Sequence, residues 1–301
     1  MVRFGLFGTG HWAAETHGAA LHAHPEAEFA GVWGRDPGKA AALADRYGVP
    51  AFTDVDALVE ACDAVAVALP PDIQADIAVR AATAGRHLLL DKPLALSVAD
   101  ADRVVDAAQA AGVASVVFFT GRYQPDIAAF LASTAAAGGW HTAEAVRFGS
   151  IFQPGNPYGA SPWRREHGAL WDVGPHALSI VLPVLGRVTH VAAMDGPRGI
   201  VHLLLRHDGG ATSTVSLTLD APQEAVSRKF VFYGENGVET VPAGEGDPAT
   251  AFGVAIDQLL EEIASGTRDH RCDVRFGREV VAVLAAAETA RAEGRTVDLP
   301  R

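Results

Sequence analysis

The stretch VRFGLFGTGHWA at residues 2–13 decides the fold of the first half of this chain. It begins with a mostly apolar run of the kind found in parallel strands that helices cover on both faces. The turn Gly8-Thr9-Gly10 follows directly, and an amphipathic helical pattern spans residues 11–22. A strand, a glycine turn and a helix in this order are typical of the phosphate-binding unit of a doubly wound, Rossmann-type sheet.

Each residue of this turn has a physical reason for its place. Gly8 permits the tight turn, Gly10 lets the backbone approach a pyrophosphate, and the free N–H groups of the following helix attract phosphate. By position, Thr9, His11 and Trp12 are expected beside the nicotinamide half of a dinucleotide. The alternative interpretation is a glycine turn that serves packing alone, with second-layer packing for these three residues.

Further along the chain, apolar runs alternate with helical patterns as far as residue 119. This alternation predicts a parallel sheet with helices on both faces. The strands expected in it are Val2–Phe7, Glu28–Trp33, Ala64–Leu69, His87–Leu90 and Ala114–Phe119.

After Thr120 the pattern changes to that of an antiparallel sheet, with a strand expected over Glu144–Phe152 and helices expected near residues 172–185, 249–265 and 277–293. Asp208-Gly209-Gly210 and Asn236-Gly237 each separate two strand patterns and are hairpin signals. The sequence therefore predicts a dinucleotide-binding domain over residues 1–119. A substrate-binding and oligomerisation domain is expected over residues 120–301, an α+β domain with a mostly antiparallel sheet.

Composition excludes several classes of protein. The net charge of −12, without any basic stretch, argues against nucleic acid and anionic membranes as partners. No apolar run approaches the roughly 20 residues that span a bilayer, and no leader precedes the first strand pattern. Two cysteines provide neither a disulfide framework nor a multi-cysteine metal site, so we expect no metal and a cytoplasmic location.

The end of the second strand bears on which cofactor is bound. NAD-binding domains usually carry an acid here for the ribose hydroxyls. In this chain the place is taken by Gly34, and the cations Arg35 and Lys39 follow it. A guanidinium suits a 2′-phosphate, so the sequence favours NADP over NAD. The alternative is that Arg35 covers the adenine while Asp36 serves the ribose.

The sharpest local feature is LLLDKPL at residues 88–94, where Asp91 and Lys92 end a buried strand. Ligands bind at this edge of open parallel sheets, and burying two charges costs several kcal/mol unless they are paired or used. We therefore expect Lys92 near the nicotinamide, donating to a substrate oxygen, with the Lys92–Pro93 bond a candidate for the cis form. A structural ion pair between Asp91 and Lys92 is the alternative.

Short-chain dehydrogenases are excluded, because they carry a tyrosine four positions before their catalytic lysine. No tyrosine stands four positions before any of the three lysines of this chain.

These residues resemble the Gfo/Idh/MocA oxidoreductase family. LPP at 69–71 and AGRHLLLDKPL at 84–94 are similar to its signature, although Asp91 replaces the usual glutamate and Gln74 stands where many members have histidine. The resemblance continues through GALWDVGPH at 168–176. It implies a catalytic set of Lys92, Asp172 and His176, cofactor contacts at Leu69, Pro70 and Lys92, and oxidation or reduction at a sugar, polyol or related carbinol.

The chemistry of this set fits hydride transfer. A carbinol must lose its hydroxyl proton, and histidine titrates near neutrality. Asp172 and His176 are four residues apart on one expected helix, so they share a face and can address one ligand. Pro175 predicts that His176 lies in the first turn of its helix, where the dipole favours neutral imidazole. Lys92 would stabilise the developing alkoxide.

The expectations for substrate and partners are coarser. Weaker candidates for substrate contact are Arg122, Tyr158, Trp163 and Arg164, for each of which packing is the alternative. Two alternative functions stay open: a dihydrodiol or biliverdin-type reductase, and a non-catalytic NAD(P)-binding sensor. The resemblance implies that the antiparallel sheet often builds a dimer. We expect the open face of this sheet to be apolar and to need cover, which predicts a homodimer or homotetramer.

Overall fold

A computed structural model describes residues 1–300 as two compact units. The first comprises Met1–Tyr123 and Gly246–Glu279, and the second comprises Gln124–Glu245 and residues 280–300. The sequence division at residue 119 is close to the first crossing of the chain. However, that division leaves the returning segment 246–279 in the second domain. The segment belongs to the first unit because helix α9 (Pro248–Ser265) packs its apolar face against the strands there.

The first unit contains a six-stranded sheet in the order β3-β2-β1-β4-β5-β6. Every neighbouring pair in it is parallel, as the sequence predicted. Its strands are β1 (Val2–Phe7), β2 (Ala27–Trp33), β3 (Ala51–Phe52), β4 (Ala64–Val67), β5 (His87–Asp91) and β6 (Ser115–Phe118). The two-residue β3 was not expected, because so short a run carries no periodicity.

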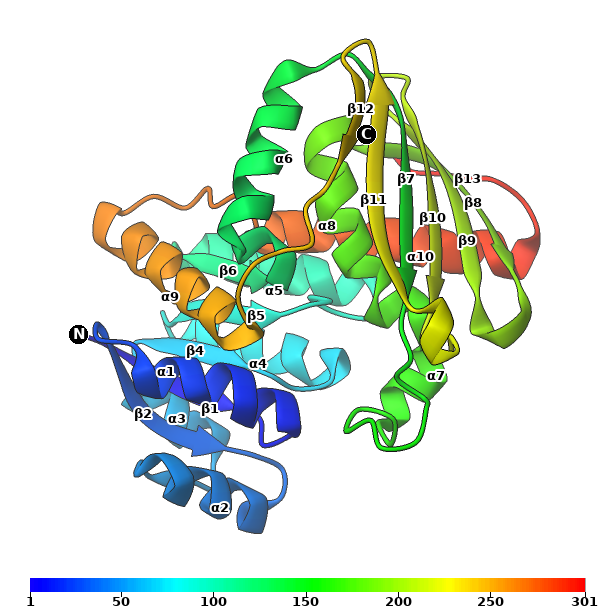
Figure 1. The fold of residues 1–301 in the computed structure, drawn as a ribbon. Helices are drawn as coiled ribbons and strands as arrows, with labels where there is room; N and C mark the ends of the chain where they lie inside the picture. Colours follow the sequence, from blue (N-terminus) through cyan, green and yellow to red (C-terminus); the bar gives the residue numbers. More distant parts are fainter. Residues whose placement is uncertain (301) are drawn as a thin grey trace. The chain divides into compact units, whose positions relative to one another are not determined.

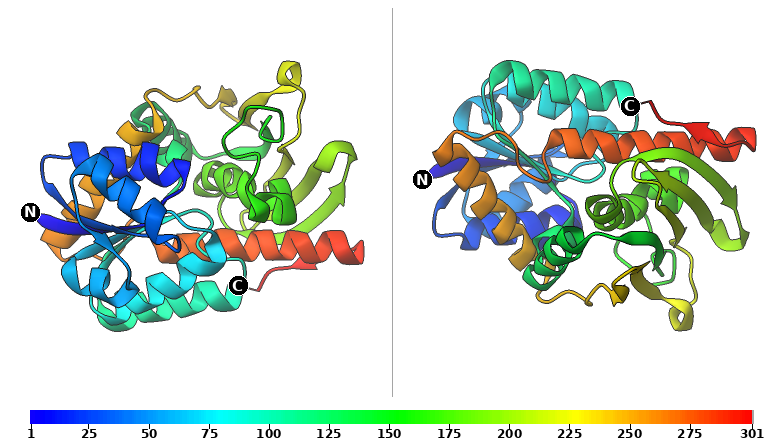
Figure 2. Two further views of the ribbon diagram at one scale, coloured as in Figure 1. Left: turned by 90° about the horizontal axis from the view of Figure 1, so that it is seen from below. Right: turned by 90° about the horizontal axis from the view of Figure 1, so that it is seen from above.

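Helices cover both faces of this sheet (Figures 1 and 2). The η1 and α1 segments pack beside α9, while α4 and α5 pack against each other. The helices are η1 (Ala13–Gly18), α1 (Ala19–Ala23), α2 (Pro37–Tyr47), α3 (Val55–Ala61), α4 (Pro71–Thr83), α5 (Val98–Ala111) and η2 (Thr120–Tyr123), besides α9.

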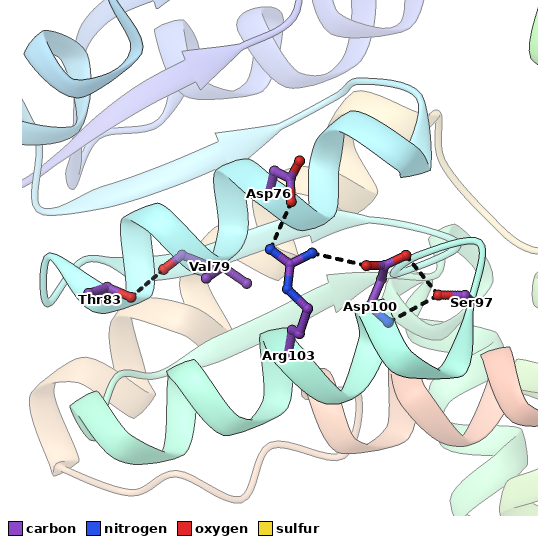
Figure 3. Close-up of polar contacts among 6 residues, drawn as sticks. All are labelled: Asp76, Val79, Thr83, Ser97, Asp100 and Arg103. Carbon is purple, nitrogen blue, oxygen red and sulfur yellow. Dashed lines mark hydrogen bonds and ion pairs between the residues drawn. The ribbon is translucent and has the colours of Figure 1, made fainter.

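Polar contacts at the surface link α4 to α5. Ser97 caps the start of α5 by accepting from the Asp100 N–H at 3.0 Å. Arg103 of α5 donates to Asp100 at 3.0 Å and reaches Asp76 of α4, also at 3.0 Å (Figure 3). These charges are largely exposed, so the apolar residues beneath them contribute most of the stability of the pair of helices.

The second unit contains a seven-stranded mixed sheet in the order β12-β11-β7-β10-β9-β8-β13. Only the β7–β10 pair is parallel, and both predicted hairpins, β9–β10 and β11–β12, are present. Two strands, β8 and β13, were not predicted. The strands are β7 (Trp140–Phe148), β8 (Val188–Asp195), β9 (Val201–His207), β10 (Thr212–Thr218), β11 (Ser227–Gly234), β12 (Gly237–Thr240) and β13 (Val297–Asp298).

Helices α6 (Pro125–Ala137), α7 (Pro162–Asp172) and α8 (Gly174–Leu185) belong to this unit, and the division between units falls within α10 (Val274–Glu293). Within residues 1–300, one helical stretch, Pro162–Leu185, has the length and hydropathy of a membrane span. Its most apolar window is 78% buried inside the protein, which is how a core helix behaves. The backbone of the stretch also leaves helical geometry at Gly168.

Candidate active site

The glycine turn has the geometry that a dinucleotide needs. Gly8 has φ 140°, and a Cβ there would lie 2.4 Å from the Ala68 carbonyl oxygen, so only glycine fits. A Cβ on Gly10 would meet nothing within 4 Å, which leaves its backbone open toward a ligand. Helical backbone begins at His11, so the positive N-terminal end of a helix lies behind that opening. These residues fit a pyrophosphate.

The end of β2 explains why no acid stands there. A Cβ on Gly34 would come within 2.5 Å of the Thr9 side chain, so any larger residue at this position would collide with the turn. The Asp36 carboxylate caps α2, accepting from the N–H groups of Gly38 at 2.9 Å and Lys39 at 3.2 Å. Arg35 and Lys39 are exposed, and neither side chain forms an ion pair within residues 1–300. The segment after β2 thus carries two exposed cations, and Asp36, the acid between them in the sequence, caps a helix.

Lys92 lies in the turn at the carboxyl end of β5, and the Lys92–Pro93 bond is cis, as the sequence suggested. The Asp91 carboxylate accepts from the Lys92 N–H at 2.8 Å. Gln74 of α4 is 1% exposed and reaches this turn with its amide. Its nitrogen lies 2.7 Å from the Asp91 carbonyl oxygen and 3.0 Å from that of Pro93, and its oxygen accepts from the Asp91 N–H at 2.9 Å.

His17 is buried behind this turn. Its ring stacks on Phe252 with 4.0 Å between centroids, and its Nε2 lies 3.8 Å from an Asp91 carboxylate oxygen. Burial lowers the pKa of His17 to about 3. The imidazole is therefore neutral at physiological pH. It lies in η1, a π-helical segment of the kind often found at functional sites.

Asp172 and His176 lie on two different helices, which corrects the expectation that one helix carries both. Asp172 ends α7, Val173 has φ −107° and ψ −15°, and α8 begins at Gly174. The break follows from Pro175, which lacks an N–H and is tolerated only in a first turn. His176 is in the first turn of α8, as predicted, and its carbonyl oxygen accepts from the Ser179 hydroxyl at 2.9 Å.

Arg164 holds Asp172 in place. Its Nε donates to a carboxylate oxygen of the almost fully buried Asp172 at 3.0 Å. The same guanidinium lies 5.0 Å from the ring centres of both Tyr158 and Trp163. Three of the predicted substrate-contact residues thus form one cluster centred on Arg164, which also binds Asp172. Burial lowers the pKa of Arg147 on β7 to about 10, and the nearby Asp172 opposes that effect.

Leu69, Pro70 and Arg122 are the remaining residues that the sequence predicted to contact cofactor or substrate. Leu69 and Pro70 follow β4 and lead into α4. The fourth substrate candidate, Arg122, is only 5% exposed and lies over the Phe276 ring, 5.5 Å from its centre. Its contact with substrate stays a prediction. Residues 1–300 hold no cluster of three or more His, Cys, Asp or Glu side chains suited to a metal.

Sequence reasoning missed the positions of Gln74, His17 and Arg147. Gln74 was noted only as a departure from a pattern, although it is the one polar residue among the buried residues of α4. Arg147 had a usable signal, because it follows Ala143 and Ala145 at alternate positions of a strand, on the face where small buried residues lie. No sequence signal pointed to the position of His17, because a histidine in a helical pattern does not reveal which residues from other segments will contact it.

Known proteins share this architecture. A GFO/IDH/MocA model described as an oxidoreductase family with an NAD-binding Rossmann fold matches residues 2–119, and the GFO/IDH/MocA C-terminal domain model matches residues 144–238. D-xylose 1-dehydrogenase (NADP(+)) 2 from Haloferax volcanii is 31% identical over 96% of this chain and 90% of that protein.

Two solved structures share the fold at low identity. A levoglucosan dehydrogenase in complex with NADH and levoglucosan has a TM-score of 0.87 at 20% identity and covers 100% of both chains. The WlbA dehydrogenase from Bordetella pertussis, in complex with NADH and UDP-GlcNAcA, has a TM-score of 0.84 at 21% identity, covering 100% of this chain and 99% of that one. With both halves matched by their models and a relative aligned along nearly its whole length, the chain belongs to the Gfo/Idh/MocA family of NAD(P)-dependent oxidoreductases.

Proposed function

We propose that this oxidoreductase acts on a carbinol or ketone of a sugar or polyol, and that Lys92, Asp172 and His176 act together on that substrate. The observation that carries the proposal is the placement of Lys92 at the carboxyl edge of the parallel sheet. Gly8 follows β1 at this edge and Pro70 follows β4, so the lysine shares an edge with the turn that fits a dinucleotide.

Each residue has a distinct task in this proposal. His176 takes the proton of the substrate hydroxyl, and Lys92 donates a hydrogen bond to the oxygen that then carries negative charge. Asp172, held by Arg164, orients the hydroxyl or the imidazole. The nicotinamide, when bound, supplies the redox chemistry. In the reverse direction the same groups return the proton to a ketone.

The substrate class is tested by a panel. D-xylose, D-glucose, myo-inositol and levoglucosan are each offered with NADP⁺ and with NAD⁺, and formation of the reduced cofactor is followed at its absorbance. We expect turnover of at least one member. Relatives named for D-xylose and levoglucosan support this class. Tight NADPH binding without turnover of these substrates or of their ketones would favour a non-catalytic sensor instead.

Neither alternative function has a specific observation in its favour. The sensor is disfavoured because the chain keeps all three members of the proposed catalytic set. The dihydrodiol or biliverdin-type reductase is disfavoured because two of the proteins described above are named as dehydrogenases of D-xylose and levoglucosan.

For the cofactor we propose NADP. Gly34 leaves no room for a ribose-binding acid, Asp36 is occupied as the cap of α2, and the cations Arg35 and Lys39 are exposed beside it. Arg35→Ser should weaken NADPH binding roughly 10- to 100-fold, because a charge-assisted contact to the 2′-phosphate is lost. NADH binding should change little.

Titration of intrinsic tryptophan fluorescence measures both affinities. Arg80→Ser, which removes an exposed arginine on α4 paired with Asp56, is the matched control and should change neither affinity. A wild-type protein that binds NADH more tightly than NADPH would contradict the NADP assignment.

For assembly and location we propose a homodimer or homotetramer in the cytosol, with a small sugar-like molecule rather than nucleic acid or membrane as the other partner. Both cysteines are buried free thiols, which suits a reducing compartment. The net charge of −12 would repel nucleic acid and anionic lipid.

A further inference from the structure

We propose that Gln74 is a positioning residue for Lys92: its buried amide fixes the peptide groups on both sides of the lysine and so directs where the ammonium group can reach. The inference rests on the proposed role of Lys92 in catalysis. It concerns a residue to which the sequence pattern gives no function.

The contacts are unusually concentrated for one side chain. The Gln74 amide meets four backbone groups of the turn: the Asp91 N–H at 2.9 Å and three carbonyl oxygens, of Asp91 at 2.7 Å, Pro93 at 3.0 Å and Leu94 at 3.3 Å. These groups flank Lys92 on both sides. Because Gln74 is 1% exposed, water cannot take the place of the amide.

The orientation of the amide follows from this network. Its oxygen must face the Asp91 N–H and its nitrogen must face the carbonyl oxygens, since the reverse would oppose donor to donor and acceptor to acceptor. Only a group that accepts once and donates twice satisfies the turn. Glutamate has the same shape but no such donors, and it would place an acceptor against three carbonyl oxygens.

The rest of the turn depends on the same peptide groups. The Lys92 N–H donates to the Asp91 carboxylate at 2.8 Å, and β5 keeps its register with β6 as far as Asp91 opposite Phe118. Asp91 is thus fixed by the sheet on one side, and Gln74 fixes the chain beyond it. A small rotation of these peptides would be amplified along the long side chain of Lys92, and misplacements of about 1 Å are costly in catalysis.

The proposal can be tested by NMR of the lysine side chains, because the chain contains few lysines. The chain has three lysines, Lys39, Lys92 and Lys229, so protein labelled with carbon-13 lysine gives three resolvable side-chain signals in NMR. The signal that disappears in the Lys92→Arg variant is assigned to Lys92. In Gln74→Glu we expect the Lys92 signal to move, while the signals of Lys39 and Lys229 stay in place.

The second readout is steady-state kinetics, measured with NADP⁺ and with a sugar from the panel that the wild type turns over. We expect kcat of Gln74→Glu to fall roughly 10- to 100-fold, with the KM for NADP⁺ within about twofold of wild type. Gln109→Glu is the matched control, because Gln109 is exposed on α5, and it should change neither readout. If Gln74→Glu does not fold, Gln74→Met, which keeps the length of the side chain but removes its donors and its acceptor, takes its place.

A folded Gln74 variant with an unmoved Lys92 signal and wild-type kcat overturns the proposal. A lower Tm with both readouts unchanged overturns it as well, because it shows a structural role only. If the wild type turns over no sugar, the proposed function fails, and the NMR arm still decides whether Gln74 controls the environment of Lys92.

Discussion

At the scale of single residues, the proposed site joins residues that the sequence could identify to partners that it could not. The motifs pointed to Lys92, Asp172 and His176 because each stands at a recognisable spacing. Gln74, the partner of the lysine turn, comes from 17 or more positions earlier in the chain. Hydrogen bonds between distant segments depend on how helices pack on strands, and no local pattern encodes them.

His17 provides a prediction at this scale. Its folded pKa of about 3 lies far below its ordinary value of 6.5 because burial disfavours the charged imidazole. Below pH 6.5 the unfolded chain therefore binds a proton that the folded protein rejects. The free energy of unfolding should be maximal with respect to this group above pH 6.5 and should fall as the pH drops toward 3.

The measurement is urea unfolding at pH 7 and pH 5, where one such group contributes a slope of up to about 1.4 kcal/mol per pH unit. His270, with a pKa lowered to about 4 by burial, acts in the same direction in the wild type and in the variant. His17→Leu should reduce the loss of stability between the two pH values. An equal loss in both proteins would show that His17 is not the neutral buried group described here.

At the scale of elements, sequence periodicity located most strands and helices of the first unit, because parallel β-α units give long apolar runs. It placed the first strand of the second unit at residues 144–152, whereas β7 spans Trp140–Phe148. It also missed α6 and read one helix over residues 172–185, where the chain changes from α7 to α8. Apolar residues continue through that junction, so periodicity could not reveal the break.

The backbone conformation of Gly168 breaks helix α7 and brings two distant side chains together. Arg164 and Asp172 are eight residues apart, which is about 12 Å along a regular helix. Their side chains nevertheless meet at 3.0 Å. The backbone of Gly168, with φ 65° and ψ −159°, leaves helical geometry between them and allows this approach.

Gly168→Ala should therefore separate the pair. An L-residue rarely adopts this conformation, so we expect a loss of about 1–3 kcal/mol of stability and a lower kcat, with NADPH affinity unchanged. Gly112→Ala is the control: Gly112 also has a positive φ, 65°, but lies at the end of α5. It should lower Tm without changing kcat. Wild-type kcat in Gly168→Ala would show that the break is not needed for activity.

At the scale of the whole molecule, the second unit exposes one face of its sheet. Strand β9 buries Val201, Leu203 and Leu205 and turns the alternate residues outward, among them Leu204, which is 54% exposed. Most of its outward neighbours are polar, so this face is less apolar than the sequence led us to expect. A mixed surface of this kind is nevertheless ordinary for an interface between subunits.

Leu204→Glu tests the proposed homo-oligomer. A buried, unpaired carboxylate on each subunit should favour the monomer, because it would lose its hydration without gaining a partner. Sedimentation velocity should show wild type as a dimer or larger and the variant shifted toward monomer. Val238→Glu, on an exposed hairpin strand of the same sheet, is the control. A monomeric wild type would contradict the proposal outright.

The joint action of Lys92, Asp172 and His176 on one substrate is the centre of this account, and single-site variants with separate binding and turnover assays test it most directly. For Lys92→Ala and His176→Ala we expect NADPH to bind within a few-fold of wild type, while kcat with a substrate found in the panel falls by roughly 100-fold or more. Lys229→Ala, which removes an exposed lysine paired with Glu144, should keep wild-type kcat. Wild-type kcat in either the Lys92 or the His176 variant would contradict the account.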